Sequence, residues 1–148
     1  MKRRRLERLR GLSLAEWLLL PQLIVLSLGV HIALLIAPLE KVAAALDRGA
    51  RAAGVRRLPL PHLSMRTGRL TAIADLATRI SSGRNRCLPR SLVLLWMMRA
   101  RGETVELLVG AAKAGGVELE GHAWIEIGGR MILDTPSTTN RFSPFLRL

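Results

Sequence analysis

The stretch Asn85-Arg86-Cys87-Leu88-Pro89-Arg90-Ser91-Leu92 contains the only cysteine of this chain of 148 residues and places it where a helix should begin. The apolar run from Leu92 to Met98 has helical propensity. Pro89 suits the first turn of a helix, and Gly102 follows the run as a C-terminal cap. The pattern therefore predicts that Cys87 lies at a helix N-terminus.

Cys87 is either a small buried hydrophobic residue, as most unpaired cysteines are, or a nucleophile. The partial positive charge at a helix start and the flanking Arg86 and Arg90 favour the thiolate, which attacks carbonyl carbons far better than a thiol does. Ser91 lies one helical turn after Cys87 on the same face, so we consider it a candidate substrate-binding residue. We predict that Cys87 is the nucleophile.

Residues after Gly102 have the pattern of a small antiparallel sheet. His122 opens one expected strand and Asp134 closes the next, so a hairpin brings the imidazole and the carboxylate to the same end of the sheet. The connection from Lys113 to Gly121 is a candidate substrate-binding loop or a plain linker. The expected strands are residues 104–109, 121–127 and 130–134.

The register of this hairpin decides whether His122 and Asp134 share a face. A tight two-residue turn at Gly128-Gly129 would put them on opposite faces, because side chains alternate along a strand. A three-residue loop that includes Arg130 pairs Trp124 with Asp134 and makes His122 its same-face diagonal neighbour. We predict the longer loop or a bulge, and we name Trp124 as a candidate wall of the site.

Four sequence features resemble the transglutaminase-like cysteine peptidases of lasso peptide biosynthesis. They are Cys-Leu-x-Arg-Ser-Leu from Cys87, His-Ala-Trp-Ile-Glu from His122, the Gly-Gly turn and the closing Asp134. The resemblance runs from Arg84 to about Asn140, in matching order. It implies an α+β fold with a transglutaminase-like or papain-like core, in which a nucleophile helix packs on a small antiparallel sheet.

The same resemblance implies the chemistry of the site. Cys87 would be the nucleophile, His122 its general base, and Asp134 the group that orients the imidazole. In the wider transglutaminase-like core, the threonine and proline after the acidic residue come in swapped order relative to Thr135-Pro136 here, so Asn140 is the alternative to Asp134.

The resemblance further implies a substrate and partners. The enzyme would remove the leader from a ribosomally made lasso peptide precursor. A separate leader-binding protein would select that precursor, and a lasso cyclase would use the trimmed peptide.

An acyl-enzyme mechanism also needs hydrogen-bond donors for the oxyanion. The backbone N–H of Cys87 is one, because of its position at the helix start. The sequence holds no glutamine at the papain-like spacing before Cys87, since the only preceding glutamine is Gln22. We name Asn85 as a candidate second donor.

Composition limits the partners and the compartment. A formal charge of +12 predicts an anionic partner, which is an acidic peptide, a membrane surface or nucleic acid. Nucleic acid ranks last, because aromatic residues are 3% of the chain and tyrosine is absent. One cysteine excludes an intrachain disulfide and fits the cytoplasm, and the sequence has no Cys/His cluster for a metal. We expect neither a metal nor a cofactor.

Residues 17–39 carry no charge and follow a basic arm at residues 1–10. This run of 23 residues is long enough to span a bilayer, and a signal sequence is an alternative. The polar residues and prolines inside it favour buried helices or a membrane-surface anchor instead. They are Pro21, Gln22, His31 and Pro38.

The rest of the N-terminal half is expected to be helical. Ser13 and Glu16 have the spacing of a capping box at the start of the apolar run. Further helices are expected at residues 40–53 and from Thr67 or Thr71 to Ile80. The proline-rich segment from Arg57 to His62 predicts a boundary between an N-terminal helical domain, residues 1–65, and a peptidase core, residues 66–148.

Three interpretations remain at this level. The chain is a leader peptidase, an acyltransferase of the same architecture that passes the acyl group to an amine, or a noncatalytic membrane-binding or peptide-binding protein with a buried cysteine. The first requires Cys87, His122 and Asp134 to meet in space.

Overall fold

The computed structural model describes residues 13–55, 65–82, 86–114 and 118–148. The basic arm and the proline-rich segment from Arg57 to His62 lie outside the described residues. Among the described residues, four long helices come first along the chain: α2 (Leu14–Ile36), α3 (Leu39–Val55), α4 (Thr67–Ser81) and α5 (Cys87–Ala100). The elements after them are β1 (Val105–Ala114), β2 (Glu118–Ile127), β3 (Arg130–Ile132), α6 (Pro136–Thr139) and β4 (Ser143–Arg147).

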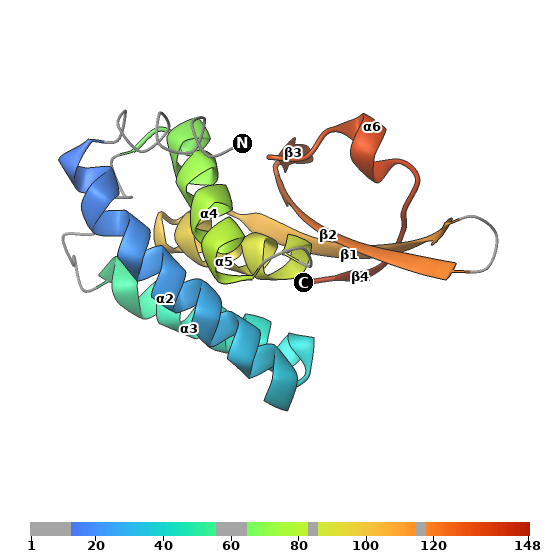
Figure 1. Cartoon of the computed structure of the whole chain (residues 1–148), viewed down its shortest axis with the longest axis horizontal. Coiled ribbons are helices and arrows are strands. Elements are labelled where there is room, and N and C mark those ends of the chain that lie inside the picture. The colour runs from blue at the N-terminus through green and yellow to red at the C-terminus, as the bar shows by residue number, and fades with distance from the viewer. Residues whose placement is uncertain (1–12, 56–64, 83–85, 115–117) are drawn as a thin grey trace.

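The helix α5 lies between the other long helices and the sheet (Figure 1). It contacts α2, α3 and α4 on one side and β1 and β2 on the other. Because α5 is covered from several directions, most of its side chains are buried rather than a single stripe. The buried ones are Pro89, Ser91, Leu92, Val93, Leu94, Leu95, Met97, Met98 and Ala100. The predicted combination of an N-terminal apolar helix, a central helix and a small antiparallel sheet is confirmed.

The helix α2 begins as the sequence predicts. The Ser13 hydroxyl accepts a hydrogen bond from the Glu16 N–H, and the Glu16 carboxylate accepts one from the Ser13 N–H. Glu16 is only 1% exposed, and its carboxylate also pairs with the Arg69 guanidinium of α4. This pair joins two helices that are far apart in sequence.

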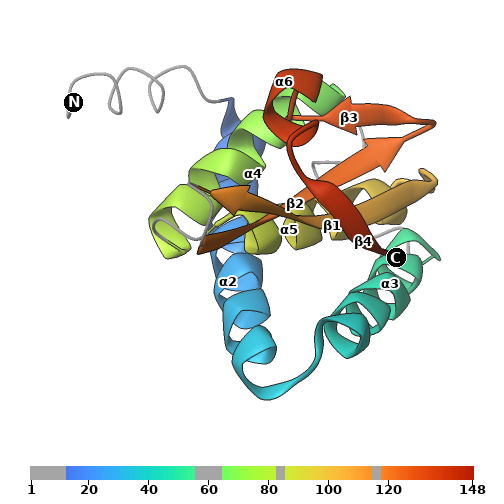
Figure 2. The same cartoon turned by 90° about the vertical axis from the view of Figure 1, so that its right-hand side faces the viewer.

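A single hydrophobic core joins the N-terminal helices to the sheet. Leu19 and Leu23 of α2 belong to the same buried cluster as Leu70 of α4 and Leu107 of β1. The core is therefore continuous across residue 65, and the N-terminal helices complete it. Figure 2 shows how α2 and α3 diverge from their connection and leave a V-shaped pair of helices on one side of the sheet.

The opposite face of α2 carries an uncovered apolar stripe. The helix continues through Pro21 and ends before Pro38, at Ala37, whose backbone is extended. At 100° per residue, the exposed large side chains all fall within about 100° of the helix circumference. They are Leu14, Trp17, Leu18, Val25, Leu28, Ile32, Leu35 and Ile36. We call them the α2 stripe.

The sheet has the antiparallel order β3-β2-β1-β4. The strand β2 begins at Glu118, so His122 lies inside a strand instead of opening one, and much of the predicted Lys113 to Gly121 connection is strand. The strand β4 was not predicted from the sequence. It pairs with β1 and places Phe142 in a small buried cluster with Leu108 and Trp124.

Gly110 marks a tight crossing of β1 and β4, at the point where their register shifts. A Cβ atom on Gly110 would lie 3.0 Å from the Ser143 carbonyl oxygen and 3.1 Å from side-chain atoms of Phe142 and Trp124. We expect Gly110→Val to lower the free energy of unfolding by about 1–3 kcal/mol, because the backbone oxygen cannot move away cheaply. Urea denaturation measures the change.

Gly121→Val is the matched control for that substitution. Gly121 also lies in a central strand, but a Cβ atom there would meet nothing within 4 Å. Equal stability of Gly110→Val and Gly121→Val would contradict the close packing of β4 against β1.

Candidate active site

Cys87 is the first residue of α5, as the sequence predicts. Pro89 lies in the first turn. Gly102, with φ of 80°, ends the helix: its N–H donates to the Arg99 carbonyl and the next N–H, of Glu103, donates to the Met98 carbonyl. The Cys87 side chain is partly buried. The helix dipole therefore acts on a thiol that still reaches the surface.

The edge of β2 holds the start of α5 in place. Two residues, Gly128 and Gly129, both with positive φ, connect β2 to β3, so Ile127 and Arg130 form the first hydrogen-bonded pair. Ala123 directs its peptide groups to the same edge as Ile127, but β3 ends before reaching it. The free carbonyl of Ala123 accepts a hydrogen bond from the Ser91 hydroxyl at 2.9 Å.

This register corrects the predicted hairpin. The turn is the tight one, Ile127 pairs with Arg130, and Arg130 is a strand residue rather than part of a three-residue loop. Strand alternation does not separate His122 from Asp134, because the ladder stops at Ile132 and Leu133 has a φ of 75°. This left-handed residue turns the chain out of the strand and brings the Asp134 carboxylate to His122.

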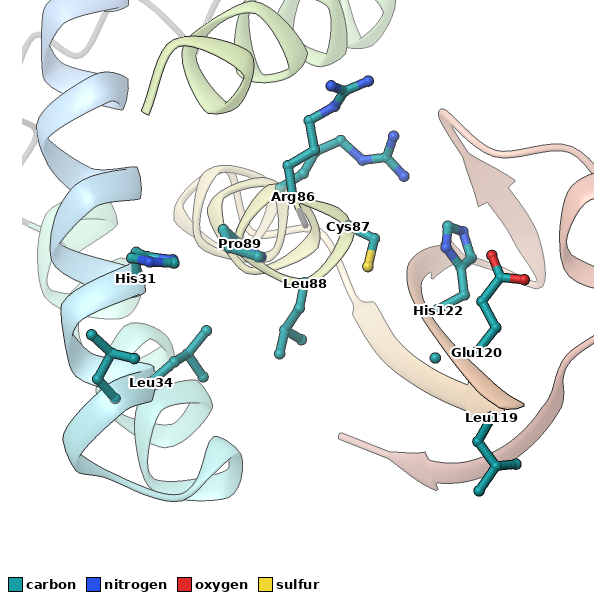
Figure 3. Close-up of a pocket in the computed structure, with 12 residues that line it drawn as sticks. His31, Leu34, Arg86, Cys87, Leu88, Pro89, Leu119, Glu120 and His122 are labelled. Atoms are coloured by element: carbon teal, nitrogen blue, oxygen red, sulfur yellow. The ribbon is translucent and has the colours of Figure 1, made fainter. Parts of the chain in front are cut away.

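His122 extends from the middle of β2 and is held by aromatic rings. Its ring stacks on Phe142, with the centroids 5.0 Å apart, and lies 6.1 Å from the indole of Trp124. Its partner across the β1–β2 ladder is Gly110. The side chain is 15% exposed. The aromatic rings restrict the imidazole to one orientation, which points toward Cys87 (Figure 3).

His122 also contacts Asp134. The separation of His122 Nε2 and Asp134 Oδ1 is 3.4 Å, which is long for a hydrogen bond but within ion-pair range. Because Nε2 faces the carboxylate, Nδ1 is the ring nitrogen left for the thiol. Such contacts are often long in an empty site and tighten when the substrate is bound.

Arg90 completes the site, and its role was not predicted. Its Nη2 atom donates to Asp134 Oδ2 at 2.7 Å, and the side chains of Arg90 and Asp134 are 12% and 9% exposed. The sequence indicated only that Arg90 adds positive charge near Cys87. Its position on α5, one turn from Cys87, lets it anchor Asp134 while Cys87 faces the pocket.

The shifts in the pKa values of Cys87 and His122 favour a thiolate–imidazolium pair. Hydrogen bonding to His122 lowers the pKa of Cys87, with further help from the N–H groups of Ala123 and Leu88, although burial opposes the shift. Interaction with Asp134, and then with Cys87, raises the pKa of His122 to about 9. Burial acts to raise the pKa of Asp134, but His122 and Arg90 together outweigh it and lower that pKa. The site therefore favours charged forms of all three groups.

Two residues predicted to contact substrate have other positions. Ser91 is buried and bonds to the Ala123 carbonyl, so it fixes α5 against β2. Trp124 is buried between Leu108 and Phe142, and its indole N–H donates to Glu126. Neither side chain lines the pocket beside Cys87. Both expectations are corrected: these residues support the site from behind.

The two remaining candidate residues are Asn85 and Asn140. Asn85 lies outside the described residues. Asn140 is exposed at the end of α6, where its N–H donates to the Pro136 carbonyl. The group that contacts His122 is Asp134. The described residues contain no cluster of three or more His, Cys, Asp or Glu side chains that could hold a metal ion.

A pocket of about 830 Å³ lies beside Cys87. Figure 3 shows Cys87 and Leu88 between two walls: α2 supplies His31 and Leu34, and β2 supplies Leu119, Glu120 and His122. His31 was not predicted at this site, because it occurs in an apolar run that is distant from Cys87 along the chain. The arrangement joins an activated nucleophile to a cavity that is large enough for a peptide segment.

Comparison with known families agrees with this geometry. A family model described as the transglutaminase-like superfamily matches residues 26–147. No curated protein and no solved structure matches the chain. The matched range covers Cys87, His122 and Asp134, and it also includes most of α2.

Proposed function

Since the chain belongs to the transglutaminase-like superfamily, we propose that it is a cysteine peptidase that removes the leader from a lasso peptide precursor. Membership suggests peptidase or acyltransferase chemistry at a cysteine. The observation that carries the proposal is the continuous contact from Cys87 through His122 and Asp134 to Arg90, beside a pocket of peptide size.

The proposed reaction is acyl transfer to water. The Cys87 thiolate attacks the scissile carbonyl carbon, and the N–H groups at the start of α5, which have no partner within the helix, favour the oxyanion. His122 then gives its proton to the leaving amine, and an acyl-enzyme remains on Cys87. Water, deprotonated by His122, hydrolyses this thioester and restores the thiolate.

The narrower assignment to lasso peptide maturation rests on sequence resemblance. The strings that begin at Cys87 and His122, together with the closing Asp134, resemble the leader peptidases of that pathway. A separate leader-binding protein would then present the precursor, and a lasso cyclase would use the product. An acyltransferase is the second candidate, because the same acyl-enzyme can be attacked by an amine.

Mass spectrometry of a lasso-type precursor, incubated with this protein and its leader-binding partner, tests the proposal. We expect two fragments whose masses sum to the precursor plus one water. Protein that has been alkylated at Cys87 with iodoacetamide is the control and should leave the precursor whole. An amine-linked product in place of hydrolysis would establish the acyltransferase. An uncut precursor that the partner demonstrably binds would reject the leader peptidase.

Contact with a membrane surface is a separate proposal, supported by the α2 stripe. The helix is long and apolar enough to cross a membrane by length and composition, but its inner face packs in the protein core. We propose that the part of the stripe outside the pocket beside Cys87, from Leu14 to Ile32, lies on an anionic lipid surface, because the chain carries a formal charge of +12 and the stripe itself is uncharged.

Cosedimentation with phosphatidylglycerol vesicles measures this contact. We expect Val25→Glu and Ile32→Glu each to weaken binding about tenfold or more, because each puts a charge on the apolar face. Phe145→Glu is the control, since Phe145 is exposed on β4, outside the stripe. Equal binding by all three variants would show that the stripe is not the surface that contacts lipid.

A further inference from the structure

The pocket beside Cys87 has an apolar part that the proposed chemistry does not use. Its lining includes Leu34 and Leu35 of α2, Leu88 of α5 and Leu119 of β2. We propose that these four leucines form a subsite for a large apolar side chain of the acyl donor, close to the carbonyl that Cys87 attacks. This inference rests on the proposed acyl-transfer function and adds the class of substrate side chain.

Exposure is the first argument for the subsite. Leu35 is 75% exposed and Leu119 is 76% exposed, although both are large apolar residues. They come from separate elements, α2 and β2, and line the same cavity. An apolar ligand between them would remove both side chains from water, which is favourable in proportion to the area covered.

Placement relative to the nucleophile is the second argument. Leu88 directly follows Cys87, and its side chain extends into the space between α2 and β2 (Figure 3). Leu34 lies across that space on α2, and Leu119 is three residues before His122 on β2. A side chain bound among these leucines therefore belongs to a residue near the attacked carbonyl.

The polar lining of the same cavity completes the recognition of a peptide. His31, Arg86 and Glu120 supply donors and an acceptor around the apolar part. Ligand sites commonly combine a mostly apolar lining with a few polar groups that fix orientation, and the cavity volume of about 830 Å³ lies in their usual range. The N-terminal helix thus contributes to substrate selection as well as to the core.

Alkylation of Cys87 tests the subsite without needing the natural substrate. Iodoacetamide and N-hexyl iodoacetamide react at the same sulfur: the sulfur–carbon bond forms and iodide leaves. The second-order rate constant for N-hexyl iodoacetamide is divided by that for iodoacetamide, and the result is divided by the same ratio measured for glutathione. This corrected ratio measures how much the protein accelerates the reaction by binding the hexyl group. We expect this corrected ratio to be about 10 or more.

Neutral substitutions show which side chains cause the faster reaction of the hexyl reagent. Leu35→Asn and Leu119→Asn are each expected to lower the corrected ratio at least about threefold, because they put an amide on the apolar lining without adding charge. Leu18→Asn is the matched control: Leu18 is also an exposed leucine of α2, but it lies outside the pocket lining. It should leave the ratio unchanged. Circular dichroism confirms that each variant is folded.

The outcomes separate this inference from the proposed function. A corrected ratio near 1 for the unmodified protein, or equal ratios for Leu35→Asn, Leu119→Asn and Leu18→Asn, would overturn the subsite even if the precursor is cut. A large ratio that falls in the two pocket variants supports the subsite even if the lasso precursor stays whole, in which case only the proposed substrate fails.

Discussion

Cys87→Ala is expected to lower the rate of precursor cleavage by about 10⁵-fold to 10⁶-fold, the loss found when a covalent nucleophile is removed from a hydrolase triad. The reason is structural: Cys87 is the only cysteine of the chain, and the described residues that line the pocket include no serine, threonine or lysine that could form an acyl-enzyme instead. Product formation, followed by mass spectrometry with wild type and variant at equal concentration, measures the loss.

The rate losses caused by removing Cys87 and His122 are not expected to be additive. His122→Ala alone should cost nearly as much as Cys87→Ala, and the double variant should be no slower than either single variant, because the two residues act as one unit. Each variant should still bind the precursor and its partner, which separates loss of chemistry from loss of folding. Residual cleavage within tenfold of wild type in Cys87→Ala would mean that another group is the nucleophile.

Asp134→Asn is expected to lower kcat/KM by about 10²-fold to 10⁴-fold, because an amide cannot stabilise the imidazolium that Cys87 requires. Asp134 is the largest cause of the raised pKa of His122, which is about 9. It also accepts the hydrogen bond from Arg90, which an amide nitrogen turned toward the guanidinium would lose. The variant therefore disturbs the imidazole and its anchor together.

The pH profile distinguishes this role from a general loss of stability. In the wild type, kcat/KM should rise as Cys87 loses its proton below its usual pKa and fall as His122 loses its proton near pH 9. Without the carboxylate the pKa of His122 falls, so the alkaline limb should move to lower pH. Glu106→Gln, a carboxylate replaced on the surface of β1, should leave both limbs in place. An unmoved alkaline limb in Asp134→Asn would contradict the assigned role.

The nucleophile helix and the N-terminal cap were predictable because both depend on local chemistry. Cys87 begins α5, Gly102 ends it, and the Ser13–Glu16 capping box forms as the spacing indicates. Each of these features is determined by residues within a turn or two of each other. The sequence also predicted that Cys87, His122 and Asp134 meet in space. That prediction depended on the order of the motifs and on a family resemblance, not on local chemistry.

The register of the β2–β3 hairpin could not be predicted, because the inference depended on the conformation of one residue just after the end of β3. Alternation of side chains excluded a tight turn only if the strand continued to Asp134, and the left-handed Leu133 removes that condition. The sequence around Leu133 does not indicate a positive φ, because leucine rarely adopts that conformation. Arg90 and His31 were not predicted at the site for a related reason. Arg90 contacts Asp134, which is 44 residues away, and His31 lines the pocket from a different helix than Cys87.

The early end of β3 also affects how the sheet meets other chains. An unpaired strand edge is a template for association with a second molecule, and short or obstructed edges prevent it. Past the Ile125–Ile132 pair, the Ala123 carbonyl at this edge of β2 already accepts a hydrogen bond from Ser91 of α5, which interrupts the row of free peptide groups. The opposite edge, β4, is five residues long and includes Pro144, which cannot donate. The early end of β3, which lets α5 and Cys87 pack against the edge of β2, thus also protects the sheet against edge-to-edge aggregation.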